Sequence, residues 1–129
     1  MNSNVNCVFC QKVEDKDYLI ENETAVSFLD SYPLTEGHTL IIPKRHISEI
    51  FNLDSKEYTD IWEIINATNK SLTDTLSPDG FNIGVNVGKE AGQTIDHAHL
   101  HLIPRYKGDI ADPRGGIRWI IPDKAPYWE

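Results

Sequence analysis

Near the end of the chain, apolar residues alternate with histidines. Because side chains on a β-strand point alternately to its two faces, a strand here would place three imidazoles on one face, about 6.5 Å apart, and apolar groups on the other. The pattern predicts a strand from Gln93 to Pro104 with one packed face and one polar face. The polar set is His97, His99 and His101, and the apolar set is Ala98, Leu100 and Leu102.

Four more segments have the composition of strands, and polar or glycine-containing turns separate them. A hairpin is predicted first, followed by a loop from Asp30 to Gly37 and then a β-branched run that reads as a central strand and ends at Pro43. A later strand alternates cleanly and is followed by a turn from Gly88 to Gly92. The four segments are Tyr18–Ile20, Ala25–Leu29, His38–Ile42 and Phe81–Val87.

One long helix is predicted between the central strand and the later pair of strands. Asp54 followed three residues later by Glu57 resembles a capping box, and Pro78 ends the helical pattern. Apolar residues recur between them at helical spacing and should cover a sheet. They are Tyr58, Ile61, Trp62, Ile65, Leu72 and Leu76. The order of elements predicts an α+β fold.

Composition limits the function classes. With 129 residues, 40% hydrophobic and 25% charged, the chain fits one domain with one core. A net charge of -8 argues against binding nucleic acid or an anionic membrane, because such binding neutralises phosphates with Lys and Arg. No run is long enough to span a membrane, and Met1 to Asn4 does not resemble a signal peptide. We expect a cytoplasmic protein.

Cys7 and Cys10 are the only cysteines, and their spacing suits one metal ion or a redox pair better than a disulfide framework. The pair lies at the start of the chain and not at the strand-to-helix turn of a thioredoxin-like unit, which weakens the redox interpretation. A metal is favoured if histidines join the two thiols.

The three alternating histidines have plainer explanations. A single histidine on an apolar face is most often a hydrogen-bonded core residue, and two at alternate positions can hold one metal ion. Three in register are costly in a core unless each has a partner, and a line of three does not easily converge on one metal. A cavity lined by the rings is the more economical interpretation.

The run from Gln93 to Arg105 resembles the signature of the histidine triad (HIT) family. The likeness extends to Phe28–Asp30, Gly37–His46 and Asn86–Gly88 and covers about residues 7–106. It implies a single HIT domain over residues 1–129, with an antiparallel sheet of about five strands, one long helix, a short one and a C-terminal tail over residues 107–129. The ending Ile103-Pro104-Arg105 is similar to the fragile-histidine-triad and diadenosine polyphosphate hydrolase branch; the phosphoramidase branch usually has Gly-Gly-Arg there.

The resemblance assigns roles to individual residues. By position, His99 is the nucleophile that attacks the α-phosphorus of a nucleotide, and its other ring nitrogen must keep its proton against a backbone carbonyl. His101 and Gln93 complete the catalytic set, and His38 supports the nucleophile from behind. The remaining predicted substrate contacts are Asn86, Gly92, Gln93 and Thr94 at the phosphate, Asp30 at the ribose, and Phe9 and Phe28 at the base.

The resemblance also implies a metal. Related bacterial members and galactose-1-phosphate uridylyltransferases bind zinc with a similar pattern, matched here by Cys7, Cys10, His46 and His97. Four thiolate and imidazole ligands fill a tetrahedral zinc site, which makes it structural and not catalytic. We therefore expect structural zinc and no organic cofactor.

The leading functional hypothesis is a homodimeric enzyme that hydrolyses diadenosine polyphosphates or similar nucleotides through a nucleotidyl-histidine. Within the same chemistry, the alternatives are a nucleoside phosphoramidate or adenylyl sulfate hydrolase and a nucleotidyl transferase that uses phosphate as acceptor. From another class, the chain would be a nucleotide-binding signalling module with weak turnover, or a zinc-stabilised scaffold. The C-terminal Trp119 and Trp128 are candidates to reach the partner's site.

Overall fold

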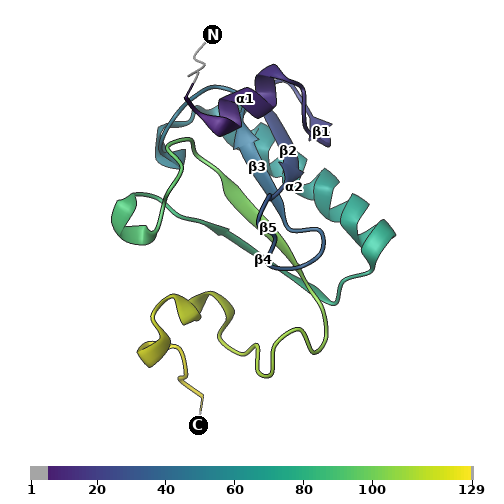
Figure 1. Cartoon of the computed structure of the whole chain (residues 1–129), viewed down its shortest axis with the longest axis vertical. Coiled ribbons are helices and arrows are strands. Elements are labelled where there is room, and N and C mark those ends of the chain that lie inside the picture. Colours follow the sequence, from purple (N-terminus) through teal and green to yellow (C-terminus); the bar gives the residue numbers. More distant parts are fainter. Residues whose placement is uncertain (1–5, 129) are drawn as a thin grey trace.

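The computed structural model describes residues 6–128 and contains a five-stranded antiparallel sheet with two α-helices (Figure 1). The strand order is β1-β2-β3-β5-β4, which confirms the predicted fold class and the central place of β3. No helix in this part of the chain combines the length and the apolar character needed to cross a membrane. The elements are α1 (Val8–Glu14), β1 (Ile20–Glu21), β2 (Ala25–Leu29), β3 (Thr39–Pro43), α2 (Ser55–Leu76), β4 (Gly80–Val85) and β5 (Leu100–Arg105).

The two helices cover opposite faces of the sheet (Figure 1). The α2 face holds the larger core, where Ile41, Leu100 and Leu102 pack against the helix. Its buried positions, Ile61, Ile64, Ile65, Thr68 and Leu72, follow the helical repeat. The predicted place of Trp62 in this stripe is wrong, because the residue is 51% exposed and is not part of the core.

Helix α1 covers a smaller core on the other face and is the short helix of the expected fold. Its Phe9 packs with Val26 and Phe28 of β2 and with Leu40 and Ile42 of β3. Strand alternation separates the two cores, since Ile41 faces α2 while its neighbours Leu40 and Ile42 face α1. The α1 face is therefore the one that carries the polar groups of the histidine run.

The predicted strand from Gln93 to Pro104 is too long by seven residues at its start. Strand β5 begins at Leu100, so only His101 of the three histidines lies in the sheet. Pairing with β3 stops at Ile41 opposite Leu100, because Pro43 has no N–H to continue the ladder. The Pro43 carbonyl instead accepts a hydrogen bond from Nε2 of His97 at 2.8 Å. The alternation of buried faces still holds, since Ala98 packs with Leu100 and Leu102 in the α2 core.

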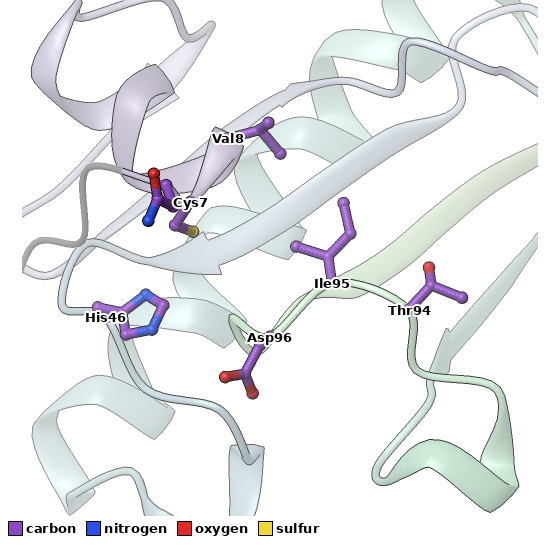
Figure 2. Close-up of a pocket in the computed structure, with 7 residues that line it drawn as sticks. Cys7, Val8, His46, Thr94, Ile95 and Asp96 are labelled. Carbon is purple, nitrogen blue, oxygen red and sulfur yellow. The ribbon is translucent and has the colours of Figure 1, made fainter.

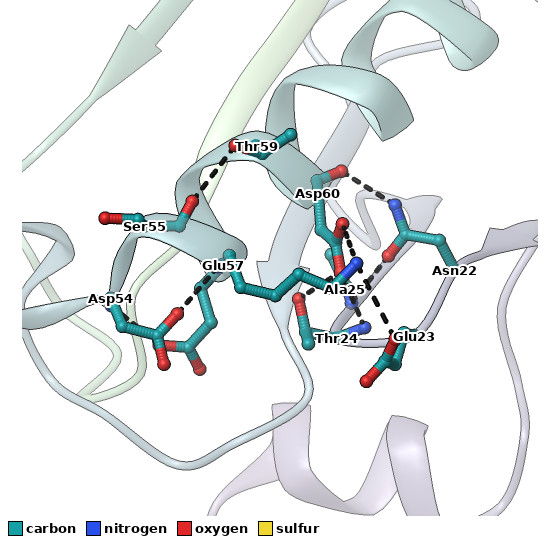
Figure 3. A network of polar contacts seen from close by, with 10 residues as sticks. Asn22, Glu23, Thr24, Ala25, Asp54, Ser55, Glu57, Thr59 and Asp60 are labelled. Carbon is teal, nitrogen blue, oxygen red and sulfur yellow. Dashed lines mark hydrogen bonds and ion pairs between the residues drawn. The ribbon is translucent and has the colours of Figure 1, made fainter.

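Polar contacts fix the start of α2 against the rest of the fold (Figure 3). The Asp54 carboxylate accepts from the Glu57 N–H at 2.8 Å, and the Glu57 carboxylate accepts from the Asp54 N–H at 3.0 Å. One turn later, the Asp60 carboxylate accepts from the hydroxyl of Thr24 at 2.7 Å, which ties the helix to the β1–β2 turn. The predicted capping box is confirmed.

We expect Asp54→Ala to lower the free energy of unfolding by about 1 kcal/mol, because it removes the acceptor of an otherwise unpaired helix N–H. Asp54→Asn should retain most of the stability, since its side-chain oxygen still caps the helix. Urea denaturation measures both. Glu63→Ala, on the exposed side of α2, is the matched control and should change stability little. Equal effects of Asp54→Ala and Glu63→Ala would contradict the role of the cap.

Candidate functional site

A pocket of about 620 Å³ lies on the α1 face of the sheet, between α1, the β2–β3 loop and the segment that leads into β5. It collects side chains from four separate parts of the chain. Most of the residues predicted from the sequence line it: Phe9, Phe28, Asp30, His38, Asn86, Gly92, Thr94, His99 and His101.

His99 is held in one defined tautomer. Its Nδ1 lies 2.7 Å from the carbonyl oxygen of His97, and because a carbonyl only accepts, Nδ1 carries the proton. In the neutral ring, Nε2 is then the nitrogen with the available lone pair. The ring is almost fully buried and lines the pocket. It meets the Phe9 ring edge to face, with the two ring centroids 5.0 Å apart. This is the arrangement of a nucleophilic imidazole.

A backbone amide fixes the proton positions of two further rings, His38 and His101. The Leu34 N–H donates to Nδ1 of His38 at 3.0 Å, so the proton of neutral His38 is on Nε2. That proton points at Nδ1 of His101, 2.9 Å away. His101 must therefore accept at Nδ1 and carry its own proton on Nε2. The Leu34 N–H and the Nε2–H of His38 are both used in this relay. The Nε2–H of His101 is left available at the pocket, beside His99.

Burial keeps both rings of this pair neutral. It lowers the pKa of His38, an effect that the nearby charge of Asp30 partly opposes. Burial likewise lowers the pKa of His101, and neighbouring His38 and His99 lower it further. A proton added to Nδ1 of His38 would face the Leu34 N–H, so the neutral state is also the one with satisfied hydrogen bonds.

His38 therefore supports a different residue from the one expected. The sequence placed it behind the nucleophile His99, but its ring bonds to His101, which lies opposite Leu40 on the neighbouring strand. Asp30 serves two purposes. One carboxylate oxygen accepts from the Tyr32 N–H at 2.9 Å and stabilises the turn, while the other lies 3.4 Å from Nε2 of His38 at the pocket wall.

Asp30, His38 and His101 have ligand atoms close enough together for a metal ion. Their hydrogen bonding argues against one. A metal at Nε2 of His38 would displace its proton to Nδ1, where the Leu34 N–H already donates. His38 and His101 form a hydrogen-bonded relay beside Asp30, and the three side chains do not form a metal site.

The loop between β4 and β5 places backbone groups beside the histidines. Gly92 has φ +99°, a conformation that residues with a Cβ rarely adopt. The amide of Gln93 holds this loop: its oxygen accepts from the Gly88 N–H, and its nitrogen donates to the carbonyls of Ser48 and Ile95. Gln93 is absent from the pocket lining, unlike Gly92 and Thr94 on either side. The structure gives Gln93 a positioning role in the loop.

A separate cluster joins the start of α1 to the histidine segment. Nδ1 of His97 lies 3.4 Å from the sulfur of Cys7 and 3.6 Å from that of Cys10, and Nδ1 of His46 lies 3.3 Å from Cys10. All four ligand atoms lie within 4.8 Å of one another. Because the proton of His97 is on Nε2, bonded to Pro43, the Nδ1 lone pair faces the sulfurs. Burial lowers the pKa of His97 to about 4, so the ring is neutral, as a metal ligand must be.

The four residues thus fit a metal that prefers thiolate and imidazole. A smaller pocket of about 380 Å³ opens beside them (Figure 2). Figure 2 shows Cys7 and His46 on one side of this pocket and Thr94, Ile95 and Asp96 on the other. Since Thr94 and Ile95 also line the larger pocket, the two pockets share a wall.

The structure adds two features to the sequence analysis. Arg105 lies outside the larger pocket and donates to Asp109 and Asn82, so the Ile-Pro-Arg ending serves the fold there. Several pocket residues were not anticipated, among them Lys12, Ser31, Tyr32 and Leu34. Lys12 had a usable signal, since it follows the predicted base contact Phe9 by three residues on what is now a helix. The loop residues had none.

Comparison with known proteins places the geometry in context. Residues 11–108 match the model of the HIT domain family. An uncharacterized HIT-like protein of Mycoplasma genitalium is 39% identical over 82% of this chain and 77% of its own. An adenosine 5'-monophosphoramidase of Candida albicans is 36% identical over 81% of this chain and 74% of its own. The crystal structure of a Zn-bound histidine triad family protein from Mycobacterium smegmatis has a TM-score of 0.74 and 34% identity, covering 82% of this chain and 79% of that one.

The tautomers are directly measurable. At neutral pH, two-bond ¹H–¹⁵N correlation spectra should show His99 protonated at Nδ1, and His38 and His101 protonated at Nε2. Because the pKa values of His38 and His101 are lowered, both rings should stay neutral as the pH falls past the ordinary value of about 6.5 and gain a proton only below it. Protonation of His38 at Nδ1 in the neutral ring, or its titration at or above that value, would contradict the relay.

Proposed function

The chain belongs to the HIT domain family, and we propose that it hydrolyses nucleoside 5′-phosphate derivatives at the α-phosphorus through a covalent nucleotidyl intermediate on His99. One observation carries the proposal: the 2.7 Å bond from Nδ1–H of His99 to the carbonyl of His97 leaves Nε2 as a lone-pair nitrogen at the pocket. The named function of the Candida albicans relative, an adenosine 5'-monophosphoramidase, is in keeping with this chemistry.

The reaction divides into two displacements at one phosphorus atom. In the first, the Nε2 lone pair of His99 forms a bond to the α-phosphorus, and the bond to the leaving group breaks with its electrons on the leaving group. In the second, a water oxygen attacks the same phosphorus and the P–N bond breaks, which returns the electron pair to Nε2. The product is the nucleoside 5′-monophosphate, and the water proton passes to solvent.

The groups around His99 suit the charge that develops on the phosphoryl oxygens. His101 is neutral and presents its Nε2–H, since its Nδ1 accepts from His38. A hydrogen-bond donor fixed in advance and partly shielded from water stabilises negative charge without reorganisation. Thr94 and the glycine-containing turn at Gly92 line the same part of the pocket and are our candidates for further phosphate contacts, with Asn86 at the bridging oxygen or the leaving group.

The opposite part of the pocket suits the nucleoside. Phe9 and Phe28 meet edge to face with centroids 5.4 Å apart and form an apolar wall for a base. Asp30 is two residues beyond Phe28 on the same side of the chain, and its carboxylate can accept from both ribose hydroxyls. We assign the ribose to Asp30 and the base to the two aromatic rings.

The candidate substrates share the nucleoside 5′-phosphate and differ in the leaving group. The Ile-Pro-Arg ending favours diadenosine polyphosphates, but Arg105 lies away from the pocket and lends no contact to that choice. The phosphoramidase relatives favour a nucleoside phosphoramidate as the second candidate. Adenylyl sulfate hydrolysis and transfer to phosphate follow the same first displacement and remain alternatives. A nucleotide-binding module with weak turnover would use the pocket without the chemistry of His99.

We further propose that Cys7, Cys10, His46 and His97 hold a structural zinc ion, as the Zn-bound relative from Mycobacterium smegmatis suggests. Four protein ligands would fill the coordination sphere, so the ion would act as a cross-link. Cys7 and Cys10 lie on either side of Phe9, and the backbone of His97 orients His99. The cross-link would therefore hold both the base wall and the nucleophile in place.

A homodimer also remains our proposal. Large apolar side chains lie exposed on the edge strand β4 and in the short helical turns of the C-terminal segment. They suit a subunit contact. The residues are Ile83, Val85, Ile117, Trp119 and Ile120.

His99→Asn should reduce turnover by about a thousandfold or more and leave nucleotide binding within a few-fold, because only the nucleophile is lost. The substrate panel is diadenosine tri- and tetraphosphate, adenosine phosphoramidate and adenylyl sulfate. Acid-quench mass spectrometry of the wild type should show a nucleotidyl group on the peptide that contains His99. Turnover retained in His99→Asn, or no turnover and no adduct with any substrate in the panel, would reject the enzyme proposal.

Protein purified without added zinc should contain about one equivalent of metal by elemental analysis, and Cys10→Ser should lose most of it because a sulfur ligand is replaced. Val8→Ala, between the ligands Cys7 and Cys10 in α1, is the matched control and should keep the metal. Cobalt substitution should give the absorption bands of a tetrahedral thiolate site. Less than a tenth of an equivalent of metal in the wild type would count against the zinc site.

A further inference from the structure

Of the described residues that line the larger pocket, Lys12 is the only lysine or arginine. It lies three residues after Phe9 in α1, which puts both side chains on the same helix face. The wall that we assign to the base therefore has a cation at its edge. The proposed displacement at phosphorus does not use this charge.

Contacts on both sides define where the ammonium group lies. Nζ of Lys12 is 5.4 Å from the ring centroid of Phe28 and 2.9 Å from a carboxylate oxygen of Asp17. The Lys12 side chain is 30% exposed, whereas that of Asp17 is 70% exposed. An ammonium has three protons to donate, so the pair with Asp17 holds Lys12 at the pocket and leaves donors for a ligand.

The proposed pose places the base at this end. The α-phosphorus lies at His99 and the ribose at Asp30, while Phe28 and Phe9 extend the same wall towards Lys12. A base in contact with these rings presents its edge to a group that only donates. Guanine offers two acceptors on one edge, O6 and N7, whereas adenine replaces O6 by an amino group that also donates. An amino group facing an ammonium gains no hydrogen bond there.

We propose that Lys12 is a specificity-determining residue that favours 6-oxopurine nucleotides, those of guanine and hypoxanthine, over adenine nucleotides. This inference rests on the proposed function, since it uses the same pocket and the same nucleotide pose. It adds a base preference to a reaction whose chemistry at phosphorus is the same for every base.

The competing role for Lys12 is general attraction of phosphate charge. The two roles differ in what they discriminate: a contact to O6 depends on the base, whereas attraction to phosphate depends only on ligand charge. Guanosine, inosine and adenosine 5′-monophosphates carry the same charge. Inosine shares O6 with guanosine but lacks the 2-amino group, so it isolates the 6-position.

Calorimetric titration with the three monophosphates tests the proposal. The wild type should bind the guanosine and inosine forms about five- to tenfold more tightly than the adenosine form, the size of one well-placed contact to a base edge. In Lys12→Met the three affinities should agree within about twofold. Asp17→Ala removes the carboxylate that holds the ammonium at the pocket and should reduce the preference. Lys70→Met, on the exposed surface of α2, is the control and should leave the ratio unchanged.

Lys12→Gln is the second variant and should reduce the ratio even if Lys12→Met fails to fold, because an amide oxygen can accept from the adenine amino group. Equal affinities in the wild type, or an equal loss for all three ligands in Lys12→Met, would overturn the base-selective role. If the wild type binds none of the three, the proposed function fails together with this inference. If the wild type binds all three without a base preference, the specificity role of Lys12 fails and the proposed function stands.

Discussion

The site depends on the hydrogen bond between Nδ1–H of His99 and the carbonyl oxygen of His97. A free imidazole exchanges its proton between two nitrogens, and only one of the two tautomers has a lone pair at the pocket. The bond at 2.7 Å selects that tautomer, and its donor and acceptor are only two residues apart in the sequence. It also makes the proton position of His99, the proposed nucleophile, sensitive to whatever holds the backbone of His97.

His97 is held on both sides of its ring. Nε2–H donates to the Pro43 carbonyl at the end of the central strand, and Nδ1 faces the sulfurs of Cys7 and Cys10. His97 thus connects the sheet, the start of α1 and His99. Because Cys7 caps α1 and the helix carries Phe9 and Cys10, a change in the Cys and His cluster would reach the proposed base wall as well as His99.

Burying several imidazoles in a small domain is costly unless each ring nitrogen has a partner. The part of the chain that the structure describes meets this condition, since it contains no buried side-chain nitrogen or oxygen without a hydrogen bond. The Leu34 N–H donates to His38, and His38 donates to His101. In a separate bond, His99 donates to the carbonyl of His97. Backbone groups thus fix the ring protons of His38 and His99, and His38 in turn fixes that of His101.

Local patterns in the sequence predicted the elements whose stability is local. The capping box at Asp54 and the strands predicted at Ala25–Leu29 and His38–Ile42 agree with the structure, because caps and strand propensity depend on residues a few positions apart. The histidine motif likewise identified the pocket. Tertiary contacts decided where β5 begins, since its ladder with β3 ends at Ile41, two residues before Pro43. They also decided which ring His38 supports, since its partner His101 lies on the neighbouring strand. Tertiary packing also placed the positive charge of Lys12 at the proposed base wall, because Lys12 reaches the pocket only once α1 has packed against β2. Sequence spacing fixes which residue types share a face, whereas proton positions and pocket walls depend on atoms that only folding brings together.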